Sequence, residues 1–361
     1  MAESDMGLNN RILRRLRCGN GGRRLIGSVM VLAVLGFGYY GFELQYPAAK
    51  TGQACSGMLP VDPVLDLVGK SRLSVSGLGF HTSSWRFDVS DDVTEPSGLA
   101  TRCKVGGAEI AIETAAGALN AYGTYTFQRD PSSFPVPLDG GWQGLMVTKD
   151  DESTASVLLS CKNWAPEKGS GILVTADSPY DTEVTEALRL KLARVVTGTA
   201  QRAAEKTGCE TDPGDARGLT APDADARTVP AGGATGTCAG MTSASTVRET
   251  DVGKSPVEEC LLIGGLQLTA AYGPFSDASD AVVDGKYGGH ETPSGIDSDR
   301  AWTSATCEGA LGVGYYHADT VEGSDRRFTS KPLTPSERAD LQHFAEQSAA
   351  RHGCRNPSAF R

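Results

Sequence analysis

The sequence predicts an α+β fold: an N-terminal transmembrane helix, then two tandem copies of a small antiparallel sheet packed by a C-terminal helix, with two disulfides in each copy. Three observations predict it. Residues 25–44 form an apolar run with a single charge at its outer edge. Four cysteines occur in each half of the chain that follows. Short sequence matches also recur between those halves in the same order, which is the signature of a duplicated unit.

The apolar run 25–44 is long enough to cross a bilayer as a helix. Six arginines precede it in the basic segment 1–24, and the positive-inside rule places that segment in the cytoplasm. We therefore expect a single-pass protein of the cell membrane, held in the lipid bilayer by this anchor, with its C-terminal domains extracellular. Two alternatives stay open. The run can be a cleaved signal peptide, or Cys55 can be lipidated after Gly52-Gln53-Ala54.

Composition limits the class of partner. The 361 residues carry a formal net charge of −10, and residues 1–24 hold six arginines against Glu3 and Asp5, so the exterior is more acidic still. An acidic exterior excludes nucleic acid as a natural partner, because phosphate binding needs a basic face. The length suits one membrane span and two modest domains.

The cysteines agree with export. Cys18 is on the predicted cytoplasmic side, and the eight others lie outside. An even number in an oxidising compartment predicts disulfides. No Cys-x-x-Cys pair occurs, which argues against zinc. The cysteines expected to form disulfides are Cys55, Cys209, Cys103, Cys161, Cys238, Cys354, Cys260 and Cys307.

The repeat sets the domain boundaries. Cys55-Ser-Gly-Met recurs as Cys238-Ala-Gly-Met, and QRAAEKTGC at 201–209 matches QSAARHGC at 347–354 with one gap. The copies are therefore 55–209 and 238–361. Residues 45–54 are predicted to be a tether. Residues 210–237 are rich in Pro, Gly, Ala, Asp and Thr, and they are predicted to be a flexible linker because they have little apolar surface to bury.

Each copy is expected to end in a helix. In the second copy Thr334 and Glu337 form a capping box with Pro335 between them, and Gly353 ends the helix. In the first copy Asp181 is the expected cap and Gly208 the end. Alternating or continuous apolar runs predict the strands. The strands are expected at 108–113, 144–149, 155–162 and 171–177, and at 260–272, 301–307 and 311–318.

Four cysteines in each copy allow three connectivities, and sequence alone does not choose among them. We expect the outer cysteines of a copy to pair and the two inner ones to join neighbouring strands. The predicted bonds are Cys55–Cys209, Cys103–Cys161, Cys238–Cys354 and Cys260–Cys307. Each is expected to contribute about 2–4 kcal/mol by restricting the unfolded chain.

No catalytic, cofactor-binding or metal site is predicted. Gly-Lys-Ser occurs twice, but Val64 and Arg248 stand where a P-loop needs its first glycine. No Gly-x-Ser-x-Gly elbow is present. Five histidines are scattered without the spacing of metal ligands. They are His81, His290, His317, His343 and His352.

The whole chain resembles uncharacterised exported proteins of high-GC actinobacteria. The resemblance rests on the arginine-rich start, the single span, the Ala/Gly/Asp/Thr-rich linker and the cysteine-stapled domains. It is also similar to the cell-envelope lipoprotein families of that group, but Gly52 stands where their lipobox has leucine. The resemblance implies an envelope location and no known activity.

We therefore expect a membrane-anchored extracytoplasmic binding or scaffolding protein with no enzymatic activity of its own. Its partner would be an envelope protein, peptide or glycan, and two copies would allow bivalent binding. The alternative is a cell-envelope hydrolase acting on wall glycan or peptide. Two facing carboxylates, or a histidine near a serine, would favour that alternative.

Overall fold

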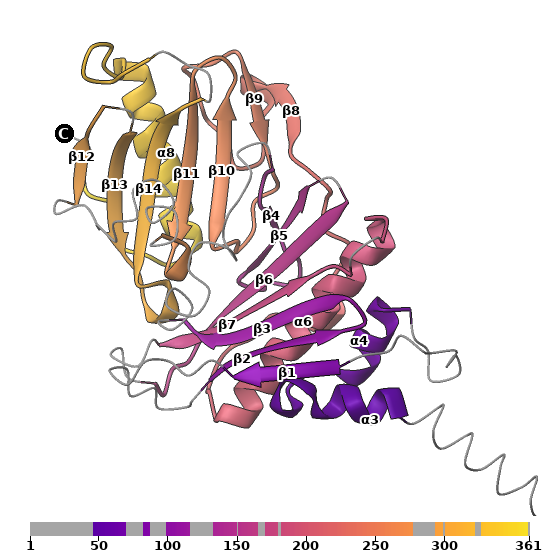
Figure 1. The fold of residues 1–361 in the computed structure, drawn as a ribbon. Coiled ribbons are helices and arrows are strands. Elements are labelled where there is room, and N and C mark those ends of the chain that lie inside the picture. The colour runs from indigo at the N-terminus through magenta and orange to yellow at the C-terminus, as the bar shows by residue number, and fades with distance from the viewer. Residues whose placement is uncertain are drawn as a thin grey trace, which may run out of the picture.

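Two seven-stranded antiparallel sheets follow each other along the chain, each with one long helix packed on it (Figure 1). The structure is a computed structural model that describes residues 46–69, 82–86, 99–115, 133–149, 151–164, 170–179, 182–276, 293–298, 300–321 and 326–359. All statements below concern these residues.

The first copy begins with short helices and ends with a long one. Its helices are α3 (Tyr46–Gln53), η2 (Ala54–Gly57), α4 (Val61–Leu67) and α6 (Glu186–Thr207). Its strands are β1 (Thr82–Arg86), β2 (Ala100–Val105), β3 (Ala108–Thr114), β4 (Val136–Pro137), β5 (Gly144–Lys149), β6 (Glu152–Ser160) and β7 (Gly171–Asp177).

The second copy is built mainly of strands. These are β8 (Arg227–Pro230), β9 (Thr246–Glu249), β10 (Val257–Leu262), β11 (Leu266–Tyr272), β12 (Ser294–Ile296), β13 (Arg300–Thr306) and β14 (Val313–Thr320). Its helices are η4 (Ala216–Gly218), η5 (Ala231–Gly233), η6 (Gly309–Leu311) and α8 (Pro335–Arg351), of which η4 precedes the sheet.

The two sheets share one strand order. The first runs β1-β2-β3-β7-β6-β5-β4, and the second runs β8-β9-β10-β11-β14-β13-β12. Without the edge strands β4 and β8 the orders correspond strand for strand. In both, a hairpin (β2–β3, β10–β11) pairs with the last strand of the copy (β7, β14). The duplication seen in the sequence is therefore present in the topology.

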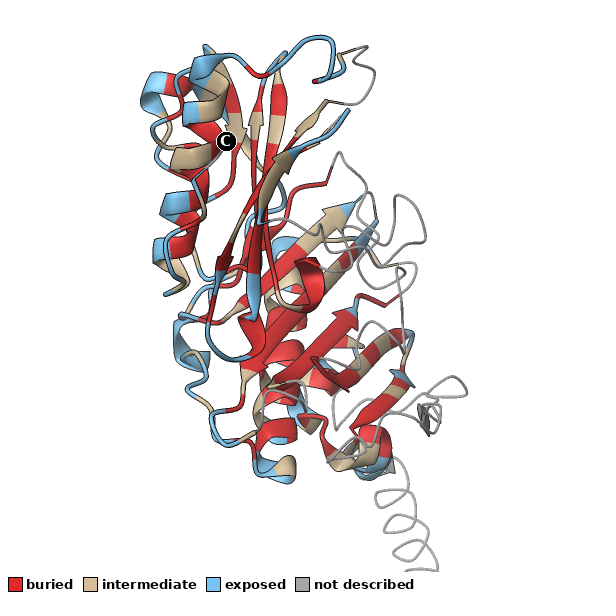
Figure 2. Ribbon diagram, turned by 90° about the vertical axis from the view of Figure 1, so that its left-hand side faces the viewer, coloured by how far each residue is buried: buried red, intermediate tan, exposed pale blue. Residues whose placement is uncertain are grey.

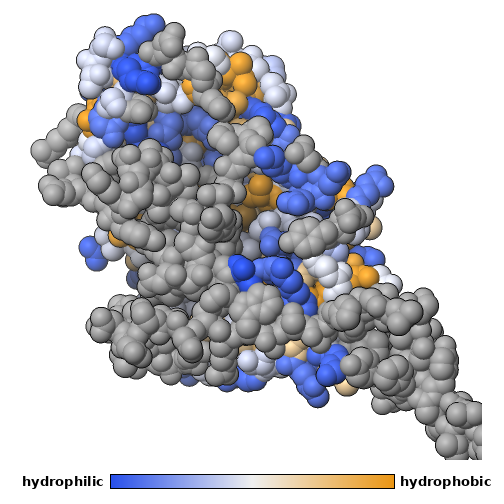
Figure 3. Space-filling model, in the orientation of Figure 1, coloured by the Kyte–Doolittle hydropathy of each residue, from blue (hydrophilic) through white to orange (hydrophobic). Residues whose placement is uncertain are grey.

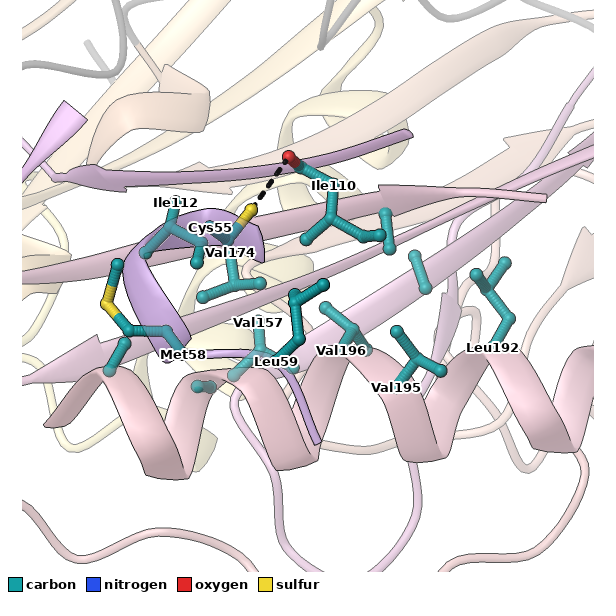
Figure 4. Packing of buried hydrophobic residues seen from close by; sticks show 14 of the residues in the cluster. Cys55, Met58, Leu59, Ile110, Ile112, Val157, Val174, Leu192, Val195 and Val196 are labelled. Carbon is teal, nitrogen blue, oxygen red and sulfur yellow. Dashed lines mark hydrogen bonds between the residues drawn. The ribbon is translucent and has the colours of Figure 1, made fainter. Parts of the chain in front are cut away.

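The core of the first copy lies between its sheet and α6. Figure 4 shows side chains of α6 such as Leu192, Val195 and Val196 lying against strand residues, with Ile110 and Val174 among them. All five are fully buried. The helix begins where Thr185 accepts a hydrogen bond from the backbone N–H of Leu188, so Thr185 and not the predicted Asp181 is the cap. It ends at Gly208 in the left-handed conformation, as predicted.

The second core lies between its sheet and α8. The predicted capping box is present: Thr334 accepts from the backbone of Glu337, whose side chain accepts from Thr334 in return. Leu341 and Phe344 are buried on the face toward the sheet, and exposed residues follow the outer face of α8 (Figure 2). The packing therefore follows the apolar periodicity of the helix.

The predicted fold class is wrong in its first element. In the described part of the chain, no helix combines the length and the apolar character needed to cross a bilayer. The longest, α6, has 22 residues but carries seven charged side chains along an amphipathic helix that covers a sheet. Residues 25–44, where the predicted membrane helix falls, lie outside the described residues.

Two segments predicted to lack structure are folded. The predicted tether 45–54 is mostly helix α3. The predicted linker 210–237 packs on the first sheet, where the backbone N–H of Asp215 donates to the carbonyl of Gly140, and then supplies edge strand β8 to the second sheet. Gly214 lies so close to Trp142 that an added Cβ would come within 2.5 Å of the indole. The absence of a side chain at Gly214 therefore lets this segment, which has few apolar residues, pack closely against the first sheet.

The predicted disulfide pairs are also wrong. The eight cysteines do form four disulfides, but each bond joins one cysteine to the next cysteine along the chain. The pairs are Cys55–Cys103, Cys161–Cys209, Cys238–Cys260 and Cys307–Cys354. The two copies use the same pattern, in which one bond ties the start of the copy to β2 or β10. The other bond ties the end of β6 or β13 to a cysteine that follows shortly after the long helix. The Cα atoms in each bond are 4.2–5.5 Å apart.

One predicted strand is a hairpin. Residues 260–272 divide into β10 and β11, which pair antiparallel. The break falls at Gly264, whose φ of +78° lies in the left-handed region that glycine adopts at low cost. Apolar residues continue on both sides of this turn, so the pattern of apolar residues alone predicts a single strand and not two.

The copies share a buried junction. Leu145, Leu158 and Leu173 of the first sheet, on the face away from α6, belong to the apolar cluster of the second copy. The backbone N–H of Ala310 in η6 donates to Ser160 Oγ at 3.1 Å across the junction. Both faces of the first sheet are therefore covered, one by α6 and one in part by the second copy.

Candidate functional site

A cluster of polar and aromatic side chains lies on the second sheet, on the face away from α8. It comes from three adjacent strands, β11, β14 and β13. We call these residues the His317 cluster: Thr269, Arg300, Trp302, Tyr315, His317 and Asp319. Alternation puts Tyr315, His317 and Asp319 on one face of β14, and residues directly opposite on neighbouring strands share that face.

Asp319 holds the cluster together. Its Oδ2 is 2.8 Å from Nδ1 of His317, and its Oδ1 accepts a hydrogen bond of 2.8 Å from Nε of Arg300. The His317 side chain is 4% exposed, and those of Arg300 and Asp319 are 18% and 31% exposed. The carboxylate thus bridges a buried imidazole and a half-buried guanidinium.

The electrostatics favour an ionised Asp319. Burial alone would raise its pKa, but the charges and hydrogen bonds of His317 and Arg300 outweigh burial and hold the pKa of Asp319 well below its usual range. An ionised carboxylate only accepts hydrogen bonds, so Nδ1 of His317 must carry the proton of the shared bond. This bond fixes the orientation of the ring and directs Nε2 away from the carboxylate.

The surroundings of Nε2 are aromatic and buried. Trp302 on β13 and Thr269 on β11 lie directly opposite His317. The ring centroids of Tyr315 and His317 are 5.8 Å apart. Nε2 itself is buried and has no hydrogen-bond partner in the described part of the chain. A buried polar atom without a partner is costly, so its presence calls for an explanation.

The first copy offers a direct comparison at the same sheet positions. Asp177 at the end of β7 corresponds to Asp319, and both lie opposite the corresponding strands of their sheets. There, Thr154 Oγ1 donates to Asp177 at 2.7 Å in place of an arginine. Thr175 and Ser156, at the positions of His317 and Trp302, hydrogen-bond each other at 3.0 Å. In the first copy, the polar side chains at these positions therefore hydrogen-bond each other.

The charge state differs between the copies as well. Partial desolvation raises the pKa of Asp177, although the bond from Thr154 opposes it, and the nearby carboxylate of Glu109 raises it further. The pKa of its counterpart Asp319 shifts in the opposite direction because His317 and Arg300 stand where the first copy has one hydroxyl. The same acidic position thus serves two electrostatic roles.

A second charged cluster lies on the other face of the sheet, under the end of α8. Glu258, whose side chain is 2% exposed, forms an ion pair with Arg351 and lies 3.1 Å from Nε2 of His352. Burial alone would raise the pKa of Glu258, but the bonds from His352 and Arg351 lower it overall. Tyr272 stacks near His352, with ring centroids 4.1 Å apart. This cluster fastens the helix end to the sheet and is structural.

The remaining residues singled out in the sequence do not join the His317 cluster. The eight cysteines are all disulfide-bonded and lie outside it. His343 lies on α8, and His81 and His290 fall outside the described residues. Among the described residues, no group of three or more metal-ligating side chains is placed to hold a metal ion.

Sequence reasoning missed the His317 cluster, although a signal was present. Residues 315–319 alternate as Tyr-Tyr-His-Ala-Asp, which places His317 and Asp319 on one face of a strand. Aligning this strand with Leu-Val-Thr-Ala-Asp at 173–177 shows that histidine replaces threonine while the aspartate recurs. Arg300 and Trp302 are found only from the sheet register.

The visible surface of the second copy mixes hydrophilic areas with small apolar ones (Figure 3). The exposed large apolar residues are scattered and come from loops, a strand end and an edge strand. They are Val252, Ile263, Ile296 and Val313. Scattered apolar side chains do not mark a docking patch.

Comparisons with known proteins assign no family. No family model matches the chain. No curated protein matches either. A solved structure with some similarity is that of DynU16, a protein of the dynemicin biosynthetic locus, at 13% sequence identity over 76% of this chain and 86% of that chain, with a TM-score of 0.12. So low a TM-score carries no argument about fold or function.

Proposed function

We propose that this protein is an extracytoplasmic binding or scaffolding protein with no enzymatic activity of its own. The observation that supports it is a frame braced in the same way in both copies, with two disulfides in each. Such bonds persist in oxidising compartments outside the cytoplasm. The His317 cluster offers a ring of fixed orientation, but Nε2 is bonded to no hydroxyl or thiol nucleophile among the described residues.

The proposed partner is an envelope protein, peptide or glycan. A rigid sheet that presents preset hydrogen-bonding groups loses little entropy on binding, which favours recognition. The copies also share a buried junction, so a partner would meet the two copies side by side.

A second function is favoured by one observation. The hydrogen bond between Nδ1 of His317 and Asp319 orients the ring and directs Nε2 away from the carboxylate, which is the geometry of a histidine–aspartate pair in acid–base catalysis. This supports the alternative of a cell-envelope hydrolase acting on wall glycan or peptide. The base would need a water or a ligand hydroxyl within hydrogen-bonding reach of Nε2.

One experiment separates the two functions. The full oxidised chain is incubated with purified, insoluble cell wall; bound protein is measured in the pellet and released fragments are measured by mass spectrometry. Binding without fragments is expected. Fragments released by the wild type but not by His317→Gln would establish the hydrolase. If the protein neither pellets nor releases fragments, wall glycan and wall peptide are excluded as partners.

A further inference from the structure

The four disulfides differ in how far their cysteines are buried. Seven of the eight bonded cysteines are buried, whereas Cys354, which is bonded to Cys307, is half-buried. Thiol–disulfide exchange begins when an external thiolate attacks a sulfur, so its rate depends on access to that sulfur. The Cys307–Cys354 bond is therefore the bond most open to reduction.

The corresponding bond of the first copy, Cys161–Cys209, is more enclosed. Both of its cysteines are buried. The side chain of Asn163 donates to the carbonyl of Gly208 at 2.8 Å and accepts from the backbone N–H of Glu210 at 3.0 Å. These two bonds lie on either side of Cys209 in the chain, so the first copy holds its cysteine in a fixed turn.

After Cys354 the chain runs along the edge of β13 as an extended segment, residues 355–359, which we call the strap. The edge strand β12 pairs only with Ala301–Thr303 of β13 (Figure 1). The strap is bonded to the part of the same edge that β12 leaves uncovered, Ser304–Thr306. Together β12 and the strap cover this edge of the sheet.

Hydrogen bonds hold the strap against β13. The backbone N–H of Arg355 donates to the carbonyl of Thr306 at 2.9 Å, and that of Ser358 donates to the carbonyl of Ser304 at 3.0 Å. The hydroxyl of Thr303 donates to the carbonyl of Ser358 at 2.6 Å. Each such bond contributes only modestly in net terms. The covalent bond at the start of the strap keeps these groups close together and so favours their pairing.

The end of α8 has a separate attachment. Glu258 forms an ion pair with Arg351 and lies 3.1 Å from Nε2 of His352, and both partners precede Cys354 in the chain. Opening the disulfide would therefore leave the helix fastened to the sheet. Only the segment after the helix would be freed.

We propose that the Cys307–Cys354 bond is a redox-sensitive lock on the strap, which a dithiol reductant opens. A thiolate of the reductant attacks Sγ of Cys354, the S–S bond breaks, and the sulfur of Cys307 leaves as a thiolate. The second thiolate of the reductant then attacks the mixed disulfide. Both cysteines end as thiols, with the two protons that the reductant gave up, and the reductant ends as a disulfide.

Release of the strap opens the edge of β13 at Ser304–Thr306. Two backbone carbonyls that the strap now occupies become available there. An open strand edge is where a sheet takes up a further strand, so the lock decides whether this edge is available. The lock does not involve Nε2 of His317, and it goes beyond the proposed function because it applies to a binding protein and to a hydrolase alike.

The first test measures which bond opens first. The full oxidised chain is treated with dithiothreitol for increasing times, free thiols are blocked with N-ethylmaleimide, and peptide mapping by mass spectrometry identifies the labelled cysteines. We expect Cys307 and Cys354 to be labelled at least about tenfold faster than Cys161 and Cys209, because access to sulfur sets the rate.

The second test measures what moves when the bond opens. Amide hydrogen exchange is recorded in the wild type at the reduction time at which the lock alone is open, and in the variant Cys307→Ser with Cys354→Ser. The amides of Arg355 and Ser358 should exchange at least about tenfold faster than in the oxidised chain, because they are the donors that pair with β13. The amides of α8 should keep their protection.

The matched control opens the corresponding bond in the first copy. Cys161→Ser with Cys209→Ser should leave the exchange of the strap amides unchanged. If either double variant fails to fold, the reduction series on the wild type still gives the answer.

Three outcomes would overturn the proposal. One is that another disulfide opens first or that all four open together. Another is that the lock opens while the amides of Arg355 and Ser358 exchange as before, so that the strap is held without it. The third is that α8 loses its protection together with the strap, in which case the bond braces the helix.

Discussion

Replacing Asp319 with asparagine tests whether the carboxylate holds the His317 cluster together. The substitution keeps the size of the side chain and removes its charge. Asp319 makes two charge-assisted hydrogen bonds of 2.8 Å, to His317 and Arg300. Each such bond contributes roughly 1.5–3 kcal/mol. Asparagine retains one acceptor oxygen, and the side chain is 31% exposed, so the net loss is about 2–3 kcal/mol.

The first copy provides the matched control. Asp177→Asn changes the same sheet position, but there the carboxylate is bonded to the hydroxyl of Thr154 and its pKa is raised, so its charge brings little stability. We expect a loss of at most about 1 kcal/mol. Two variants of identical chemistry should therefore differ because their partners differ.

Amide hydrogen exchange is the assay, because a protein with two copies does not unfold in one two-state step. Exchange is followed separately in β11–β14 and in β3–β7. Asp319→Asn should speed exchange roughly 30- to 150-fold in the second sheet, for amides that exchange through its unfolding. Asp177→Asn should change the first sheet less than about tenfold.

The pH dependence follows from the lowered pKa. Because the folded pKa of Asp319 lies below the ordinary value of 3.8, its stabilisation is complete above that pH and is lost as the pH falls toward the folded value. The gap between wild type and Asp319→Asn should therefore shrink below pH 3.8. A gap that stays constant in acid, or a larger effect at Asp177, would refute the reasoning.

Three further predictions follow. Gly214→Val should detach the segment 210–222 and speed its cleavage by proteases, because a Cβ there would be 2.5 Å from the indole of Trp142. Gly232→Ala is the control and should leave the cleavage rate unchanged, because Gly232 has open space around it. Replacing Cys238 and Cys260 with serine should destabilise the second copy by about 3 kcal/mol in denaturant unfolding, from a sequence separation of 22, and peptide mapping of the wild type should recover this pair. Glu258→Gln should lower the exchange protection of α8 by about 3 kcal/mol at neutral pH. The loss should be smaller below pH 4.5, because the lowered pKa of this carboxyl contributes stability that disappears in acid. Unchanged exchange of α8 amides would contradict a structural role of the Glu258 ion pair.

The local signals in the sequence predicted local structure well. The capping box at Thr334 and the stop at Gly208 need only their neighbours in the chain, and both are present. The eight cysteines of the two copies were recognisable from their even number, and all of them are bonded. The duplication was visible because each copy repeats its cysteines with similar matches.

The segment 210–237 was predicted to be flexible from its composition, and this prediction is wrong because buried hydrogen bonds order part of the segment. Apolar content predicted flexibility, but Glu249, fully buried, accepts from the backbone N–H groups of Thr235, Gly236 and Cys238 and from Arg227. Hydrogen bonds to a buried carboxylate order a chain that has little apolar surface. An argument from composition considers only the side chains of a segment, so it does not include the hydrogen bonds that its backbone N–H groups donate.

The sequence by itself determined that eight cysteines would be bonded, that the unit is repeated and that Thr334 caps the last helix, because these properties depend on residue type and spacing along the chain. The tertiary structure alone decided which cysteine meets which, and that Arg300 and Trp302 lie beside His317. Both depend on strand order and register, which bring residues far apart in the chain to within bonding distance, and a shift of one residue would turn every such side chain to the other face.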